Sequence, residues 1–71
     1  MVTYCIQEEK LYHKDLGYYT AFAIKAFQNN KLVEFVSDVF LDKEKANSFV
    51  RQCNELQVVL VHLYDVIDDI L

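Results

Sequence analysis

The chain has 71 residues, of which 54% are hydrophobic and 25% are charged, and its formal net charge is −4. This length allows one small domain spanning residues 1–71, and the single glycine and the absence of proline leave no flexible linker. No apolar run reaches the roughly 20 residues that cross a bilayer. The first ten residues lack the basic and then apolar pattern of a signal peptide. We therefore expect a cytoplasmic protein with no membrane partner.

The negative charge is concentrated at the C-terminal end. Residues 52–71 contain Glu55, Asp65, Asp68 and Asp69 and no lysine or arginine. An acidic chain without a basic stripe binds nucleic acid poorly, because neutralisation of phosphates supplies most of that affinity. Direct binding of nucleic acid is therefore not expected.

The first part of the chain predicts a strand and a polar connection. Residues 2–7 (VTYCIQ) alternate in polarity, which is typical of a strand with one buried face. Residues 8–17 (EEKLYHKDLG) are polar and end at Gly17, which predicts a connection. Leu11 and Tyr12 offer an alternative, in which the strand continues into this segment.

Two runs rich in β-branched and aromatic side chains follow, at residues 18–27 and 32–40, and they predict a hairpin. Asn29 and Asn30 between them suit a type I′ turn, because asparagine tolerates the positive φ that this turn needs at both centres. The turn predicts that Gln28 faces Lys31, followed by the pairs Phe27–Leu32, Lys25–Glu34, Ile24–Phe35 and Ala23–Val36. One face would then hold Phe22, Ile24, Ala26, Val33, Phe35 and Val39, and the other Ala21, Ala23, Lys25, Glu34, Val36 and Asp38.

The second part of the chain has helical spacing. Asp42 suits a helix N-cap, and Glu44 suits the first turn that follows. The apolar residues of this segment recur at i, i+3, i+4 and i+7, the spacing of a one-sided helix: Ala46, Phe49, Val50, Cys53 and Leu56.

A second helix is predicted from about residue 59. Its apolar stripe consists of Leu60, Leu63, Ile67 and Ile70, widened by Val59, Val66 and Leu71. The β-branched composition of residues 58–61 leaves a terminal strand over residues 58–64 as the alternative. The predicted fold class is α+β, with a three-stranded antiparallel meander and a C-terminal helical hairpin packed on one face.

The tail carries a resemblance to a known family. Residues His62, Leu63, Asp65, Val66, Ile67 and Asp69 follow the form His-Leu-x-Asp-Val-Ile-x-Asp. With this tail, residues 17–71 resemble an uncharacterised family of short Firmicutes proteins, a domain of unknown function. The resemblance implies a hairpin followed by an Asp-initiated helix, and it implies no chemistry.

Few residues suggest a catalytic or metal site. His62, Asp65 and Asp69 fall on one helical face, and divalent metals accept such ligands. That face lacks a fourth ligand and the supporting residues that a metal site needs. Cys5 and Cys53 are far apart in a chain without a CxxC motif, and we expect two free, mostly buried thiols. We therefore predict no metal, no cofactor and no catalytic residue.

The acidic tail is one candidate interaction surface. Asp65, Asp68 and Asp69, with His62, either form the solvated face of an amphipathic helix or meet a basic partner surface. Carboxylates near a helix C-terminus are disfavoured by the helix dipole, by about 0.3–1 kcal/mol. Complementary charge on a partner would offset that cost and guide the encounter.

Aromatic and apolar strand residues form the other candidate surface. Tyr12, Tyr18 and Tyr19 predict an exposed aromatic edge of the kind enriched in interfaces, with ordinary strand residues as the alternative. Val36 is assigned to a second sheet face that is too apolar for plain solvent surface, together with Ala21, Ala23 and Phe27. We therefore expect a protein partner or a two-fold homodimer at this face or at the Tyr18–Tyr19 edge.

These expectations give a ranking of functions. The first is a non-catalytic protein-interaction or regulatory module of a bacterial cytoplasm. The alternative is a small acidic inhibitor, phage-derived, that occupies the nucleic-acid channel of a basic protein; a net charge of −4 is modest for mimicking phosphates. A small enzyme ranks third, because a chain of this size with one glycine leaves little room for a pocket.

Overall fold

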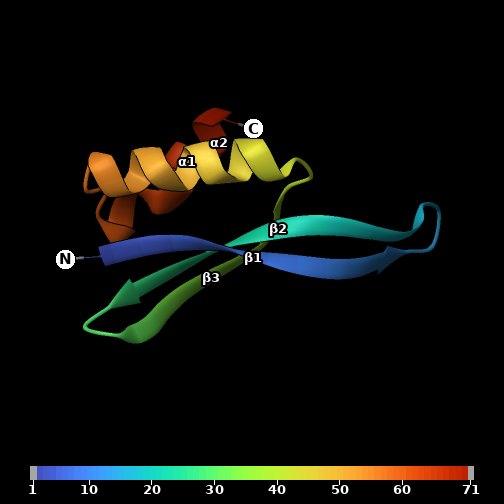
Figure 1. The fold of residues 1–71 in the computed structure, drawn as a ribbon, viewed down its shortest axis with the longest axis horizontal. Coiled ribbons are helices and arrows are strands. Elements are labelled where there is room, and N and C mark those ends of the chain that lie inside the picture. The colour runs from blue at the N-terminus through green and yellow to red at the C-terminus, as the bar shows by residue number, and fades with distance from the viewer. Residues whose placement is uncertain (1, 71) are drawn as a thin grey trace.

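The computed structural model describes residues 2–70 and has the predicted α+β fold. Three strands come first: β1 (Val2–His13), β2 (Gly17–Gln28) and β3 (Lys31–Phe40). Helix α1 (Lys43–Glu55), the 3₁₀ turn η1 (Leu60–His62) and helix α2 (Leu63–Ile70) follow. The sheet is antiparallel in the order β1-β2-β3. The helices lie on one of its faces, and the turn between β1 and β2 projects beyond them (Figure 1). We call the helix side the covered face and the other side the open face.

Strand β1 is longer than predicted. The segment assigned to a polar connection belongs to β1 as far as His13, and a turn closed by the Leu16 N–H donating to the His13 carbonyl (3.0 Å) leads into β2. Gly17 begins β2 at φ +77°, where a side chain would be strained. The polar residues fit because β1 lies at the edge of the sheet and its far half extends beyond the helices.

The turn between β2 and β3 is confirmed, and the register beyond it is wrong. Asn29 and Asn30 have φ of 54° and 65°, and the adjoining pairs Gln28–Lys31 and Phe27–Leu32 form as predicted. A β-bulge then places Val33 as an extra residue in β3. The observed pairs are therefore Ala26–Glu34, Lys25–Phe35 and Ile24–Val36, in place of Lys25–Glu34, Ile24–Phe35 and Ala23–Val36.

The bulge exchanges the two faces of β3. Side chains alternate along a strand, so an extra residue moves every later side chain to the opposite face. Val36 packs against the core on the covered face, and Phe35 lies on the open face with 42% of its surface exposed. A second irregularity follows between the pairs Ile24–Val36 and Phe22–Phe40, and Asp38 lies within it at φ 57°.

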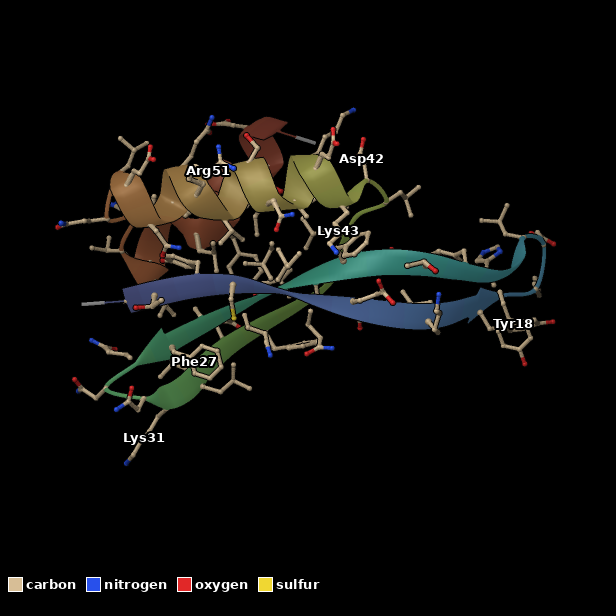
Figure 2. All side chains as sticks on the ribbon, in the orientation of Figure 1. Tyr18, Phe27, Lys31, Asp42, Lys43 and Arg51 are labelled. Atoms are coloured by element: carbon tan, nitrogen blue, oxygen red, sulfur yellow. The ribbon has the colours of Figure 1, made fainter. Side chains whose placement is uncertain are left out.

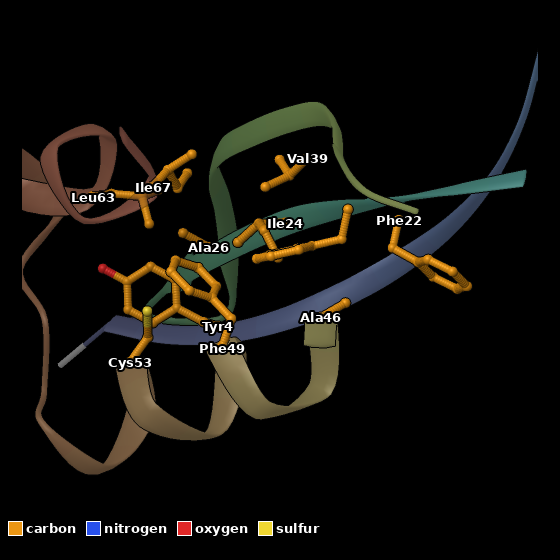
Figure 3. Close-up of a cluster of buried hydrophobic side chains, with 11 residues drawn as sticks. Tyr4, Phe22, Ile24, Ala26, Val39, Ala46, Phe49, Cys53, Leu63 and Ile67 are labelled. Atoms are coloured by element: carbon orange, nitrogen blue, oxygen red, sulfur yellow. The ribbon is translucent and has the colours of Figure 1, made fainter. Parts of the chain in front are cut away.

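The core lies between the covered face and the helices (Figure 3). Its largest fully buried side chains are Tyr4, Ile24, Cys53 and Leu63. The remaining members of the core cluster are Phe22, Ala26, Val39, Phe40, Ala46, Phe49 and Ile67. Strands and both helices contribute, so burial of this cluster holds the helical layer on the sheet.

Both ends of α1 follow from local chemistry. The Asp42 carboxylate accepts hydrogen bonds from the backbone N–H groups of Glu44 (2.8 Å) and Lys45 (3.4 Å), as expected of an N-cap. At the other end Gln57 adopts φ 52°, and the Val58 N–H donates to the Cys53 carbonyl (3.0 Å), which is the pattern of a Schellman cap. The predicted stripe is confirmed except at its end, because Leu56 lies at this cap and is 75% exposed.

The C-terminal segment is helical, which decides against the terminal strand. It begins with η1 and continues as α2, slightly later than predicted. Leu63 and Ile67 of the predicted stripe are buried, and Val59 is exposed. The Ile70 side chain and Leu71 lie outside the described residues. Within residues 2–70, the helices are all too short or too polar to cross a membrane.

Candidate interaction surface

The acidic tail lies on α2 and the turn before it. His62, Asp65, Asp68 and Asp69 are exposed, and the His62 Nδ1 lies 3.8 Å from the Asp65 Oδ2. Because α2 begins only at Leu63, Asp65 falls in its first turn, where the helix dipole favours a carboxylate. Asp68 and Asp69 fall near the opposite end, where the dipole disfavours them. No group of three potential metal ligands comes together within residues 2–70.

The three tyrosines of the predicted aromatic edge do not form one surface. The rings of Tyr12 and Tyr18 pack at 5.1 Å between centroids, and these side chains are 64% and 84% exposed. Tyr18 lies near the projecting turn, away from α1 (Figure 2). Tyr19 is half-buried, and its hydroxyl donates to the Asp38 carboxylate (3.0 Å). This hydrogen bond, with partial burial, raises the pKa of Tyr19. The structure therefore separates Tyr19 from the Tyr12–Tyr18 pair.

The assignment of Val36 to an exposed second face is wrong. Val36 lies on the covered face beside Ile24 because of the bulge at Val33. Ala21 and Ala23 do lie on the open face, but both are fully buried there. A partner is not needed to cover these two alanines.

Polar side chains cover the two alanines from either side. The Lys25 ammonium donates to the Gln7 amide oxygen (3.1 Å), and Gln7 pairs with Ala23 across the strands. Glu9, opposite Ala21, reaches across the sheet to β3. Its carboxylate accepts hydrogen bonds from the Ser37 hydroxyl (2.9 and 3.0 Å) and from the backbone N–H of Asp38 (3.0 Å). The middle of the open face is therefore a hydrogen-bonded polar surface.

The end of the open face near the β2–β3 turn is apolar. We call this the hairpin patch, and it comprises Cys5, Phe27, Leu32, Val33 and Phe35. The last three are 52%, 42% and 42% exposed, and Cys5 and Phe27 are half-buried. Figure 2 shows Phe27 on the side of the sheet away from α1. A shallow cavity of about 470 Å³ adjoins the patch, lined by Thr3, Phe27, Asn29 and Asn30.

The hairpin patch was missed from the sequence. The predicted register placed Val33 and Phe35 in the core, and the bulge turns Phe35 outward. The sequence holds no signal that marks Val33, because Leu32–Val33, Phe35–Val36 and Val39–Phe40 are all adjacent apolar pairs in β3. Lys25 lies beside the patch, with its Nζ 5.7 Å from the centroid of the Phe27 ring.

The two cysteines are free, as predicted, and differ in exposure. Cys53 is buried in the core, and burial raises the pKa of its thiol. A thiol with a raised pKa is a poor nucleophile at neutral pH. Cys5 is half-buried on the open face at the margin of the hairpin patch. The prediction of burial therefore holds for Cys53 and only in part for Cys5.

A second cavity, of about 560 Å³, lies between the projecting turn and the start of α1 and is lined by Leu16, Tyr19, Asp38, Val39 and Leu41. Its one carboxylate, Asp38, is bound to the Tyr19 hydroxyl. Tyr19 and Asp38 are the two polar side chains that line this cavity, and they are bound to each other.

Comparison with known proteins places the chain in a family. No curated protein matches it, and no solved structure matches it. A family model, described as a family of unknown function (DUF6514), matches residues 1–71. The expected membership of a family of unknown function is thus confirmed, and the match includes the N-terminal strand as well. The restriction to Firmicutes and the tail motif stay predictions. The chain belongs to this family of unknown function, DUF6514.

Proposed function

We propose that the protein is a non-catalytic interaction module of a bacterial cytoplasm, which docks a partner protein through the hairpin patch. The observation that carries the proposal is the apolar end of the open face, where Leu32, Val33 and Phe35 are each more than 40% exposed. Contiguous exposed apolar side chains next to a polar rim are typical of protein interaction sites.

The surroundings of the patch suit a protein partner. Phe27 and Phe35 supply aromatic surface, and aromatic side chains are enriched at the centre of interfaces. The neighbouring Gln7, Lys25 and Asn30 form a polar rim that can hydrogen-bond a partner backbone. The shallow cavity beside Phe27 could receive one projecting side chain of the partner.

Site-specific photocrosslinking in cells tests this proposal. A photoreactive amino acid at Phe35 should give one or a few defined protein adducts, identified by mass spectrometry. The matched control is the same amino acid at Asn47, an exposed position on α1. A charged substitution, Val33→Asp, should abolish adducts formed by a probe at Leu32 while the chain stays folded by circular dichroism. Equal adducts from the probes at Phe35 and Asn47 would contradict the proposal.

The second candidate function is that of an acidic inhibitor that occupies a basic protein surface. It is supported by the exposure of Asp65, Asp68 and Asp69, none of which has a lysine or arginine within 4.0 Å among the described residues. Such carboxylates remain available to a partner cation.

A probe on the acidic tail distinguishes the two candidates. A photoreactive amino acid at Asp68 should give adducts with basic proteins if the tail is the contact, and none if the hairpin patch is. The triple substitution Asp65→Asn, Asp68→Asn, Asp69→Asn should weaken the tail contact at low salt, because added salt screens exposed charges. Unchanged adducts from the triple variant at low salt would remove the inhibitor as a candidate.

A further inference from the structure

Strand β1 is an edge strand whose outer side is bonded by another element at one place. Among the residues that the structure describes, the bonds that another element makes to this side come from Asn54 at the end of α1. Its Oδ1 accepts from the Tyr4 N–H (2.8 Å), and its Nδ2 donates to the Tyr4 carbonyl (3.0 Å). The side-chain amide thus takes the place of a neighbouring strand at Tyr4. Beyond Tyr4, the described residues make one further bond on this side, which comes from β1 itself: the exposed Gln7 Nε2 donates to the Glu8 carbonyl (3.1 Å).

The Asn54 contact fixes which backbone groups of β1 point outward. In an antiparallel ladder, residues alternate between those bonded to the neighbouring strand and those facing the other way. Because Tyr4 faces outward and the pairing with β2 is unbroken from Val2 to His13, the same holds for Ile6, Glu8, Lys10 and Tyr12. These residues present a regular row of N–H and carbonyl groups that bond to no other strand, which is a template for pairing. The Glu8 carbonyl accepts from the exposed Gln7 amide of the same strand, which a pairing strand would displace.

The free part of this edge is centred on Glu9. It begins after Tyr4, whose backbone groups are bonded to the Asn54 side chain, and it ends with the strand at His13. A two-fold axis at Glu9 pairs residues 5–13 with the same residues of a second copy over their whole length. Glu8 then lies opposite Lys10 of the second copy, and Ile6 lies opposite its Tyr12.

Charge selects this register over its neighbours. With the axis at Glu9, both Glu8–Lys10 pairs bring opposite charges together, and such cross-strand pairs are stabilising. Moving the axis by one residue places Glu8 opposite Glu8, or Lys10 opposite Lys10, which is destabilising. Moving the axis by half a residue would pair residues whose backbone groups point outward with residues whose groups point toward β2. No ladder could form in that register.

Glu9 itself is held away from the axis. Its carboxylate accepts hydrogen bonds from Ser37 and from the Asp38 backbone, on the far side of β2. The negative charges of two copies therefore point away from each other, each toward its own β3. The aromatic ring of Tyr12, 64% exposed in one chain, gains apolar surface beside the half-buried Ile6 of the other.

The opposite edge of the sheet lacks these properties. Strand β3 is interrupted by the bulge at Val33 and again by the irregularity around Asp38. Bulges are a common device that prevents an edge from pairing with another strand. Of the two edges, only β1 offers a regular ladder within the described residues.

We infer that two copies of this chain pair through β1, antiparallel about a two-fold axis at Glu9, into one continuous six-stranded sheet. The strand order is β3-β2-β1 in one copy followed by β1-β2-β3 in the other. This surface is separate from the hairpin patch, so the inference goes beyond the proposed function and stands or falls without it.

Charge reversal provides a direct test by sedimentation or light scattering. The unaltered chain should have twice the 8.4 kDa mass of one chain. Glu8→Lys alone and Lys10→Glu alone should each weaken the dimer roughly tenfold or more, because each variant brings like charges together. The double variant Glu8→Lys, Lys10→Glu should dimerise again. A mixture of the two single variants should form a heterodimer, because one chain then carries two lysines and the other two glutamates.

Each outcome decides the inference. A monomeric unaltered chain would overturn it, and so would a dimer that both single reversals leave intact. Dissociation by the single reversals without recovery in the double variant or the mixture would overturn the register. Circular dichroism of each variant shows whether the monomer remains folded, and the two reversals provide independent routes if one of them does not fold.

A disulfide trap locates the axis by a second route. Directly opposed residues at a non-hydrogen-bonded antiparallel pair have Cα atoms about 4.5 Å apart, within the range that a disulfide spans. Glu9→Cys with Cys5→Ser should therefore form a covalent dimer under mild oxidation, whereas Thr3→Cys with Cys5→Ser, outside the free edge, should not. Equal trapping at both positions would contradict the axis at Glu9.

Discussion

The two faces of the sheet bury their small residues in different ways. On the covered face Ala26 and Ile24 are fully buried beneath side chains from α1 and α2 (Figure 3). On the open face Ala21 and Ala23 are equally buried, although no helix lies above them. Polar side chains cover them instead, in two hydrogen-bonded pairs: Lys25 with Gln7, and Ser37 with Glu9.

This difference shows that complete burial does not identify a core. The covered face is held by apolar contact that excludes water, and its energy scales with the apolar area removed from water. The open face is held by exposed hydrogen bonds, each of which exchanges with water and contributes little net free energy. We therefore expect substitutions on the two faces to differ in magnitude, in salt dependence and in pH dependence.

The largest expected effect is on the covered face. Ile24→Ala should lower the free energy of unfolding by about 2–5 kcal/mol, because a fully buried side chain leaves a cavity. Phe35→Ala on the open face should cost about 1 kcal/mol or less, since it is already 42% exposed. Urea denaturation measures both. If Ile24→Ala does not fold, Ile24→Val should still cost about 0.5–1.5 kcal/mol. A cost for Phe35→Ala equal to that of Ile24→Ala would mean that the open face is packed as a core.

The next effect concerns Asn54, which joins α1 to the edge of the sheet. Asn54→Ala removes both bonds to the Tyr4 backbone and should cost about 1–2 kcal/mol. The matched control is Asn47→Ala, an exposed position in the same helix, which carries the same gain in helix propensity without losing a bond. Amide hydrogen exchange at Tyr4 should accelerate in the first variant alone. Equal stabilities of the two variants would show that Asn54 contributes nothing.

A smaller effect is expected for the polar cover of the open face. Glu9→Gln and Ser37→Ala should each cost about 1 kcal/mol or less, because the bonds they lose are exposed. The double variant should cost less than the sum, since both substitutions remove the same contact. The coupling should shrink in high salt. Strict additivity would contradict a direct role of the Glu9–Ser37 contact.

Features with local sequence signals were predicted correctly, whereas features that depend on packing between elements were not. The Asn29–Asn30 turn and the Asp42 N-cap were predicted because their signals are local. The bulge at Val33 was not predicted, because the pattern of β3 alone also fits an unbroken register, and the choice depends on how β3 packs against β2 and the core. Val36 was assigned to the wrong face for that reason. Residues 8–13 were predicted as a connection because an edge strand with both faces exposed to solvent lacks the alternation of polar and apolar residues.

The candidate site shows the same limit. His62, Asp65, Asp68 and Asp69 were predicted as exposed, and they are, because a short amphipathic helix shows its wet face in the sequence. The hairpin patch was not found, because it depends on which way Phe35 points after a single extra residue. Whether a residue lies on a free surface is therefore a tertiary property that a local pattern does not contain.

The smallest expected effect is on the free energy of unfolding at alkaline pH. Its physical cause differs between the two faces of the sheet. Burial is the main reason that the pKa of Tyr4 is raised above 10.0 on the covered face, whereas the bond to Asp38 is the main reason for Tyr19 on the open face. A folded chain with raised tyrosine pKa values holds protons that the unfolded chain releases above about pH 10, so the free energy of unfolding is unaffected below that pH and falls above it. Tyr4→Phe should reduce the decrease in the free energy of unfolding with rising pH, and by the same amount at low and high salt. Tyr19→Phe should flatten it less, and only at low salt, because the interaction with Asp38 is exposed and screened. Urea denaturation at several pH values between about 8 and 11 measures both slopes. A flattening by Tyr19→Phe that persists in high salt would show that burial, and not the Asp38 carboxylate, controls the open face.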